Sequence, residues 1–247
     1  MSGHSKWATI KRAKGAKDAQ RGKLFAKLIR AIEVAAREGG SSVAGNATLA
    51  DAVAKAKDSS VPNDTIDRAI KRGAGELEGQ RLELVTYEGY APGGVAVLVE
   101  CYTDNRNRTS SEVRRVFTRA GGNLADPGSV SYLFSRKGEI IVQPDADEDQ
   151  VMEVALDAGA EDVVGGAAGF TVTTEPGDFR SVRAAFDATG VPYESAQVTM
   201  VASVSVPVGE DDAGKVLRLL DALDELDDVQ DVYANFDISD EVMAKVG

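Results

Sequence analysis

The spacing of the apolar residues changes at a glycine-rich stretch, residues 73–79, and this change limits the folds that the chain can adopt. Before it, apolar residues recur three and four positions apart in three short segments, which is the periodicity of amphipathic helices. After it, residues 82–87 and 95–102 are rich in β-branched and aromatic residues, which is typical of strands. We therefore expect a small helical unit followed by a larger α+β part.

The helical unit should contain three helices that pack as a bundle. The first is expected over residues 21–38, Asn46 can cap the second, and the third begins near Pro62 and ends at Gly73. The stripe predicted to be buried on the first helix consists of Leu24, Phe25, Leu28, Ile29, Ile32 and Ala35.

The α+β part should contain a helix that starts at Thr109, because Thr109 and Glu112 have the spacing of a capping box. A strand is predicted over residues 129–134, and from Gly138 the pattern follows the order βαββαβ of a ferredoxin-like domain. The segments of that unit are a strand to residue 142, a helix over 147–158, strands near 162 and over 170–173, a helix over 178–189 and a strand over 193–200. A strand over 201–206, a helix over 211–226 and a strand over 229–234 follow, and they would complete the unit that began near residue 80.

The expected fold class is therefore multidomain α+β, with a three-helix bundle followed by two ferredoxin-like α+β domains, one inserted in the other. The predicted limits are 1–79 for the basic helical domain, 80–136 plus 201–247 for the discontinuous α+β domain, and 137–200 for the inserted βαββαβ domain.

Charge is distributed unevenly along the chain. The 247 residues carry a net charge of −12, but residues 1–72 contain 15 Lys and Arg against 7 Asp and Glu, which gives +8 there and −20 in the remainder. A basic part can face phosphate groups while an acidic part keeps the molecule soluble and limits indiscriminate adhesion. This pattern predicts a nucleic-acid partner for the N-terminal part.

Several chemistries lack the residues that they need. His4 is the sole histidine, Cys101 is the sole cysteine, and no glycine-rich stretch has the spacing of a phosphate loop. We expect no enzymatic activity, no cofactor, no metal site and no small-molecule substrate. A metal-dependent phosphodiesterase would require Glu100, Asp104 and Glu112 to converge. No segment has the apolar length of a membrane helix or a secretory leader, so we expect a cytoplasmic protein without a membrane partner.

The principal candidate site is the basic N-terminal segment, where cations lie close to Trp7, the only tryptophan. Cations attract phosphate and an exposed indole can stack on a base. The candidate nucleic-acid-binding residues are His4, Lys6, Trp7, Lys11, Arg12, Lys14, Lys17, Arg21, Lys23, Lys27 and Arg30. The alternative is a solvated basic terminus whose tryptophan packs on the bundle.

A second candidate lies between a strand and a helix. It comprises Asp104, Asn105, Arg106, Asn107, Arg108 and Thr109. Two arginines beside two amides could hold phosphate or contact a base edge, and a helix N-terminus offers free N–H donors. Alternatively, the segment is a loop held together by its own side-chain hydrogen bonds with an ordinary helix cap.

The chain resembles the YebC family, and the resemblance extends over essentially its whole length. The motifs that carry it are GHSKW at 3–7, DAQRGKLFAKLIR at 18–30, YEGYAPGG at 87–94, DNRNRT at 104–109, GGNL at 121–124, SYLFSRKG at 131–138 and DVQDVYANFDI at 228–238. The resemblance implies a helical N-terminal domain, two α+β domains and a role that is not enzymatic. It also implies that Gly3–Trp7 and the lysines that follow face the partner.

The family has been linked to two functions. Members are commonly labelled transcriptional regulators that bind DNA, whereas related proteins, including a mitochondrial translational activator of cytochrome oxidase, act on the ribosome and help difficult nascent sequences such as proline runs. This chain has Asn46–Ala50 where many relatives have an NPxLR-like start to the second helix, so a contact that needs that arginine is not expected here.

Two hypotheses about the partner follow. A mobile basic arm suits RNA on the ribosome, so a translation factor is the leading hypothesis. The alternative is a transcription regulator that binds duplex DNA through the third helix, which offers Asn63, Arg68, Lys71 and Arg72 but also carries Asp64 and Asp67. The oligomeric state is left open.

Overall fold

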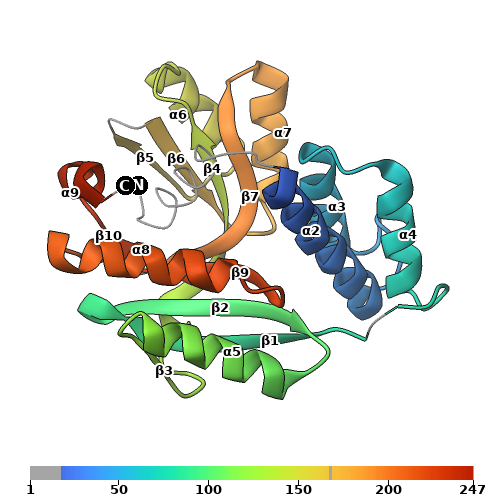
Figure 1. The fold of residues 1–247 in the computed structure, drawn as a ribbon. Coiled ribbons are helices and arrows are strands. Elements are labelled where there is room, and N and C mark those ends of the chain that lie inside the picture. The colour runs from blue at the N-terminus through green and yellow to red at the C-terminus, as the bar shows by residue number, and fades with distance from the viewer. Residues whose placement is uncertain (1–17, 80, 167–168, 247) are drawn as a thin grey trace.

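The computed structural model describes residues 18–79, 81–166 and 169–246. Three helices, α2 (Asp18–Gly39), α3 (Ala47–Asp58) and α4 (Asn63–Gly73), form the bundle at one side of the molecule (Figure 1). Their core is an apolar cluster that comprises Leu28, Ile32, Ala35, Ala36, Leu49, Val53, Ala56, Val61, Ile66 and Ala69. The three predicted helices are thus observed, although Leu24, expected to be buried, is 44% exposed because the buried face of α2 centres on Leu28 and Ile32.

Two residues, Asn46 and Gly73, set the geometry of the bundle. The Asn46 side chain accepts a hydrogen bond from the Leu49 N–H at 3.0 Å, which confirms the predicted cap of α3. Its amide also donates to the carbonyl of Ala35, 2.8 Å away, and so fixes the end of α2 against α3. At Gly73 a Cβ atom would lie 2.4 Å from the carbonyl oxygen of Glu33, so α2 and α4 approach as closely as they do only because glycine is present.

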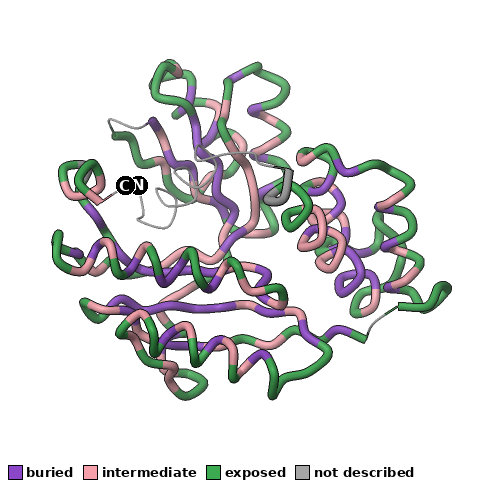
Figure 2. Tube along the Cα trace, viewed as in Figure 1, coloured by how far each residue is buried: buried purple, intermediate pink, exposed green. Residues whose placement is uncertain are grey.

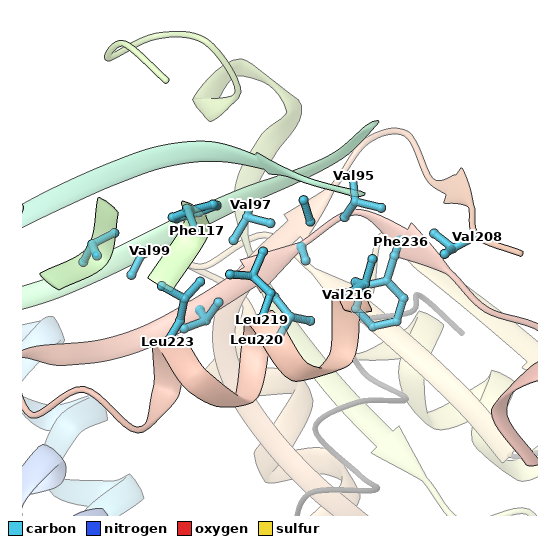
Figure 3. Close-up of a cluster of buried hydrophobic side chains, with 14 of the residues drawn as sticks. Val95, Val97, Val99, Phe117, Val208, Val216, Leu219, Leu220, Leu223 and Phe236 are labelled. Atoms are coloured by element: carbon cyan, nitrogen blue, oxygen red, sulfur yellow. The ribbon is translucent and has the colours of Figure 1, made fainter. Parts of the chain in front are cut away.

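The first sheet has the strand order β3-β1-β2-β9. Its strands are β1 (Glu83–Ala91), β2 (Val95–Thr103), β3 (Asn123–Leu124) and β9 (Val229–Ala234). Two helices, α5 (Arg106–Arg119) and α8 (Glu210–Asp224), pack on one face, with the short helix η1 (Pro92–Gly94) joining β1 to β2. Figure 3 shows Val95, Val97 and Val99 of β2 directed at the apolar side of α8.

The second sheet has the order β5-β6-β4-β7. The unit built on this sheet comprises, in chain order, β4 (Phe134–Val142), α6 (Glu148–Asp157), β5 (Asp162–Gly166), β6 (Gly169–Thr174), α7 (Phe179–Thr189) and β7 (Tyr193–Ala202). The order of these elements is βαββαβ, as predicted, and their core is built around residues that include Ile140, Val172 and Phe186. In Figure 2 the buried residues follow the strands and the inward sides of the helices.

The ends of this unit differ from the prediction. The strand predicted over 129–134 is wrong, because Ser131–Leu133 form the short helix η2 and β4 then runs unbroken to Val142. The strand predicted over 201–206 is also wrong: β7 ends at Ala202, and β8 (Val206–Pro207) is a separate short strand that pairs with β10 (Phe236–Asp237). The reason is that β4 and β7 pair from Phe134 opposite Ala202 to Val142 opposite Tyr193, so backbone pairing continues across both expected domain limits. The division into three domains therefore remains a prediction.

The last element, α9 (Asp240–Val246), was not predicted. None of the helices within the described ranges is long and apolar enough to span a membrane.

Candidate nucleic-acid interface

Three basic side chains of α2 lie on the side of the helix that faces the C-terminal end of α8. Lys23, Lys27 and Arg30 are spaced by four and three residues, which places them on one side of a helix. The apolar residues Leu28 and Ile32 occupy another side and enter the bundle core. α2 is therefore held by its apolar side, while Lys23, Lys27 and Arg30 are directed at the C-terminal end of α8.

These cations contact a run of acidic residues, Asp224–Asp228, which we call the acidic turn. The Lys27 ammonium donates to Oδ1 of Asp224 at 2.8 Å and to the Asp224 carbonyl oxygen at 3.1 Å. The Lys23 ammonium forms an ion pair with Glu225, and the Arg30 guanidinium donates to the carbonyl oxygen of Asp227. Three of the predicted binding residues thus have partners within the chain.

The position of the acidic turn explains why it attracts these cations. It begins at the C-terminus of α8, where the last carbonyl groups lack helical partners and the helix dipole is negative. Carboxylates at such a position are unfavourable unless cations compensate them, and α2 supplies the cations. The hydrogen bond to Glu225 raises the pKa of Lys23.

The remaining members of the principal candidate site are Arg21, which the structure describes, and seven residues that it does not describe. His4, Lys6, Trp7, Lys11, Arg12, Lys14 and Lys17 lie outside the described residues. Arg21 is exposed, and its guanidinium carbon lies 5.4 Å from the centre of the Phe25 ring, within the range of a cation–π contact. Whether these residues bind nucleic acid stays a prediction.

Four residues of the second candidate segment, Arg106–Thr109, belong to α5, and Asp104 and Asn105 precede the helix. The predicted capping box at Thr109 is wrong, because α5 begins at Arg106 and its cap is Asn105, whose side chain accepts from the N–H of Arg108 at 3.1 Å. Thr109 lies within the first turns of the helix and is buried.

The charged groups of this segment are matched by acids from other parts of the chain. The Arg106 guanidinium makes two hydrogen bonds to Glu83, at 2.6 and 2.8 Å. The Arg108 guanidinium lies between Asp104, 2.9 Å away, and Asp228 of the acidic turn, 2.7 Å away. Both arginines are therefore paired with carboxylates.

Asp228 joins this segment to the acidic turn. Its Oδ2 accepts a hydrogen bond from the buried hydroxyl of Thr109 at 2.6 Å. Burial alone would raise the pKa of Asp228, but the hydrogen bonds from Thr109 and Arg108 outweigh it and the pKa lies below its ordinary value. These contacts fit the alternative in which Asp104–Thr109 maintain local structure.

The carboxylates required by the phosphodiesterase hypothesis do not converge. Glu100 lies on the face of β2 that carries Ala96 and Leu98, opposite to the face covered by α5, whereas Glu112 belongs to α5. Asp104 pairs with Arg108. In the part of the chain that the structure describes, no group of three or more His, Cys, Asp or Glu side chains is arranged to hold a metal ion.

Two family models together match most of the chain. The TACO1/YebC protein N-terminal domain matches residues 5–76, and the TACO1/YebC second and third domain matches residues 82–236. The chain belongs to the TACO1/YebC family. The gap between the two matches, residues 77–81, falls within the segment that joins α4 to β1. The resemblance described from the motifs is thereby confirmed.

Relatives within the TACO1/YebC family are similar over their full length. A protein from Acidothermus cellulolyticus is 60% identical over 248 residues, with 100% of both chains covered, and one from Salinispora arenicola is 59% identical over 249 residues with the same coverage. Both are named "Probable transcriptional regulatory protein". The crystal structure of a conserved hypothetical protein from Aquifex aeolicus is similar, with a TM-score of 0.81, 52% identity and coverage of 92% of this chain and 94% of that one.

The sequence reasoning missed the acidic partners of the site. The acidic turn was visible as a run of acids directly after a helix, but nothing local pairs it with α2, about 200 residues earlier. Glu88, within the motif YEGYAPGG, was also missed: its carboxylate accepts from the N–H groups of Gly128, Val130 and Ser131 at 2.6–2.8 Å. The predicted strand ended at residue 87, whereas β1 continues to Ala91, so the buried position of Glu88 was not foreseen.

Proposed function

We propose that this protein is a non-enzymatic regulator of gene expression that binds nucleic acid, with RNA on the ribosome as its principal target. The observation that carries the proposal is the charge of the N-terminal segment: residues 1–17 contain five Lys and Arg and no Asp or Glu. Phosphate neutralisation by such cations supplies much of the affinity of nucleic-acid-binding proteins. Trp7 adds a ring on which a base can stack.

The contacts of α2 divide the candidate residues into two groups. Lys23, Lys27 and Arg30 are engaged by the acidic turn and hold α2 in place. The proposal therefore assigns the primary phosphate contacts to the cations that precede α2 and to the exposed Arg21. The carboxylates of the acidic turn repel phosphate from the side of α2 that faces the end of α8. This repulsion favours binding of nucleic acid at the basic N-terminal segment.

The contacts of α4 favour RNA over sequence-reading of duplex DNA. A recognition helix needs free side chains that reach base edges in the major groove. On α4, Arg68 is ion-paired with Asp64, and Arg72 lies 2.6 Å from a carboxylate oxygen of Glu33. Of the cations proposed for groove reading, these two are already occupied, which leaves Lys71.

The more detailed role, assistance with difficult nascent sequences such as proline runs, rests on the resemblance to relatives that act on the ribosome. The alternative is a transcription regulator that binds duplex DNA. The printed names of the relatives from Acidothermus cellulolyticus and Salinispora arenicola favour that alternative.

The test compares ribosome co-sedimentation with duplex DNA affinity for the full chain at near-physiological salt. A variant in which Lys11, Arg12, Lys14 and Lys17 are changed to alanine should fold normally and lose ribosome binding. For single-stranded RNA, its plot of log affinity against log salt should be less steep by roughly 0.7 for each lost phosphate contact, or about 3 in total. Sequence-selective DNA binding without ribosome association would support the alternative, and unchanged affinity would refute the proposal.

A further inference from the structure

The outer surface of α5 is basic although it lies in the acidic part of the chain. Residues 73–247 contain 13 Lys and Arg against 33 Asp and Glu. Five of those 13 cations are arginines of α5, whose 14 residues include a single acid, Glu112. α5 is therefore a local reversal of the surrounding charge, on the side of the first sheet that faces outward (Figure 1).

Three of these arginines differ from the other two in their contacts. Arg106 and Arg108 are paired with carboxylates. Arg114, Arg115 and Arg119 are exposed, and none of them has a carboxylate within 4.0 Å among the described residues. We call these three residues the arginine face.

The arginine face has little to do with the stability of α5. Its residues lie away from the buried side of the helix, which consists of Thr109, Val113 and Phe117. Arg115 and Arg119 are four residues apart, and like charges at that spacing destabilise a helix slightly. Arg119 lies in the last turn and gains from the helix dipole, but Arg114 and Arg115 do not. The clustering of these three exposed arginines is better explained by contact with a negatively charged partner.

The chemistry of the arginine face specifies a polyanion with regularly spaced phosphates. A guanidinium group is planar and can donate two parallel hydrogen bonds to one phosphate. With a rise of about 1.5 Å per residue, Arg115 and Arg119 are about 6 Å apart along the helix axis, so two guanidiniums can contact neighbouring phosphates of one strand. The excess of Asp and Glu in the rest of residues 73–247 disfavours phosphate binding elsewhere on that part of the chain.

We propose that Arg114, Arg115 and Arg119 form a second RNA-binding surface, which contacts the phosphate backbone independently of the basic N-terminal segment. The identity of the polyanion as RNA rests on the proposed function, whereas the location of the surface rests on the contacts of α5. One molecule then holds RNA at two places, and the acidic turn contacts both α2 and the first turn of α5.

The test uses the full chain and a single-stranded RNA oligonucleotide of mixed sequence, with affinity measured between about 50 and 200 mM salt. In the first variant, Arg114, Arg115 and Arg119 are changed to glutamine, which removes the charge and keeps the helix propensity. The slope of log affinity against log salt should become less steep by about 2, and affinity at the lowest salt should fall at least tenfold. A second variant with lysine at the same positions keeps the charge and should retain the slope.

A charge-matched control separates a specific surface from a general effect of net charge. Changing Lys215, Arg218 and Lys245 to glutamine removes three cations from α8 and α9, so both the control and the glutamine variant shift the net charge from −12 to −15. The control should bind RNA with the wild-type slope.

Equal behaviour of the control and the glutamine variant of the arginine face would overturn the inference. So would a reduced slope that occurs with duplex DNA but not with RNA, because the surface would then serve a different nucleic acid. If the N-terminal alanine variant loses affinity while the arginine-face variant does not, this inference fails and the proposed function stands. If the wild-type chain binds no RNA, both fail.

Discussion

Lys27 of α2 contacts Asp224 twice, at the carboxylate and at the main-chain carbonyl, with donor–acceptor distances of 2.8 and 3.1 Å. The two side chains are only 13% and 18% exposed, so the pair is partly removed from water. It lies where the helical bundle meets the end of α8. A lysine that would be assigned to phosphate binding from charge alone thus fixes the position of the bundle against the first sheet.

Changing Lys27 to methionine should reduce the free energy of unfolding by about 1–3 kcal/mol, because a partly buried carboxylate loses its charged donor. Urea unfolding monitored by circular dichroism measures this. Lys23→Met is the matched control on the same side of α2: its side chain is 46% exposed, and a surface ion pair contributes less than about 1 kcal/mol. Equal losses for the two variants would contradict the role given to Lys27.

A second prediction concerns the hydroxyl of Thr109, which is buried between Asp228, at 2.6 Å, and Thr103, at 2.8 Å. Thr109→Val should destabilise the protein by about 1–3 kcal/mol, since Asp228 loses a hydrogen bond inside the fold. Affinity for RNA should be unchanged if this segment maintains local structure. Ser111→Ala is the control, because that exposed hydroxyl on the same helix contacts only the backbone and should change stability by less than about 0.5 kcal/mol. Weaker RNA binding by a normally folded Thr109→Val protein would restore the binding hypothesis.

The parts of the fold that were predictable depend on neighbours in sequence. The cap at Asn46, the end of α4 at Gly73 and the strand β9 over Val229–Ala234 were recognised because caps, glycines and alternating residues act over a few positions. The same holds for the order βαββαβ.

The parts that were not predictable depend on residues that are distant in sequence. No local pattern indicates that Lys27 meets Asp224 or that Thr109 meets Asp228. The limits of β4 were misjudged because a strand extends as far as its partner does, and the partner, β7, lies about 60 residues away. The arginine face has no carboxylate partner among the described residues. This too depends on which side of α5 the other elements of the fold leave exposed.

A third prediction concerns Cys101, which is fully buried in the core of the first sheet. Burial raises the pKa of its thiol to about 12, so only about one molecule in 10,000 carries a thiolate at pH 8. The native protein should therefore react with a thiol reagent only as fast as it unfolds, and addition of urea should expose one equivalent at once. Rapid labelling without denaturant at pH 8 would show that the sheet opens locally.

The last prediction concerns Glu88 of β1, which is 6% exposed and anchors the segment that leads into η2. Its carboxylate accepts from the N–H groups of Gly128, Val130 and Ser131. Glu88→Gln should reduce the free energy of unfolding at pH 7 by about 1.5–3 kcal/mol, because an amide N–H₂ group then faces backbone donors. Glu153→Gln on the exposed side of α6 is the control and should have little effect.

The effect of Glu88 should depend on pH in a defined direction. Burial would raise the pKa of Glu88, but the three backbone N–H groups outweigh it and the pKa lies below its ordinary value. The stabilisation is thus complete above the unfolded pKa of about 4.3 and is lost as the pH falls through the lower folded pKa. Urea titrations from pH 7 to pH 3 should show the difference between wild type and Glu88→Gln narrowing below about pH 4. A difference that stays constant over this range would mean that the ionised carboxylate does not anchor the segment.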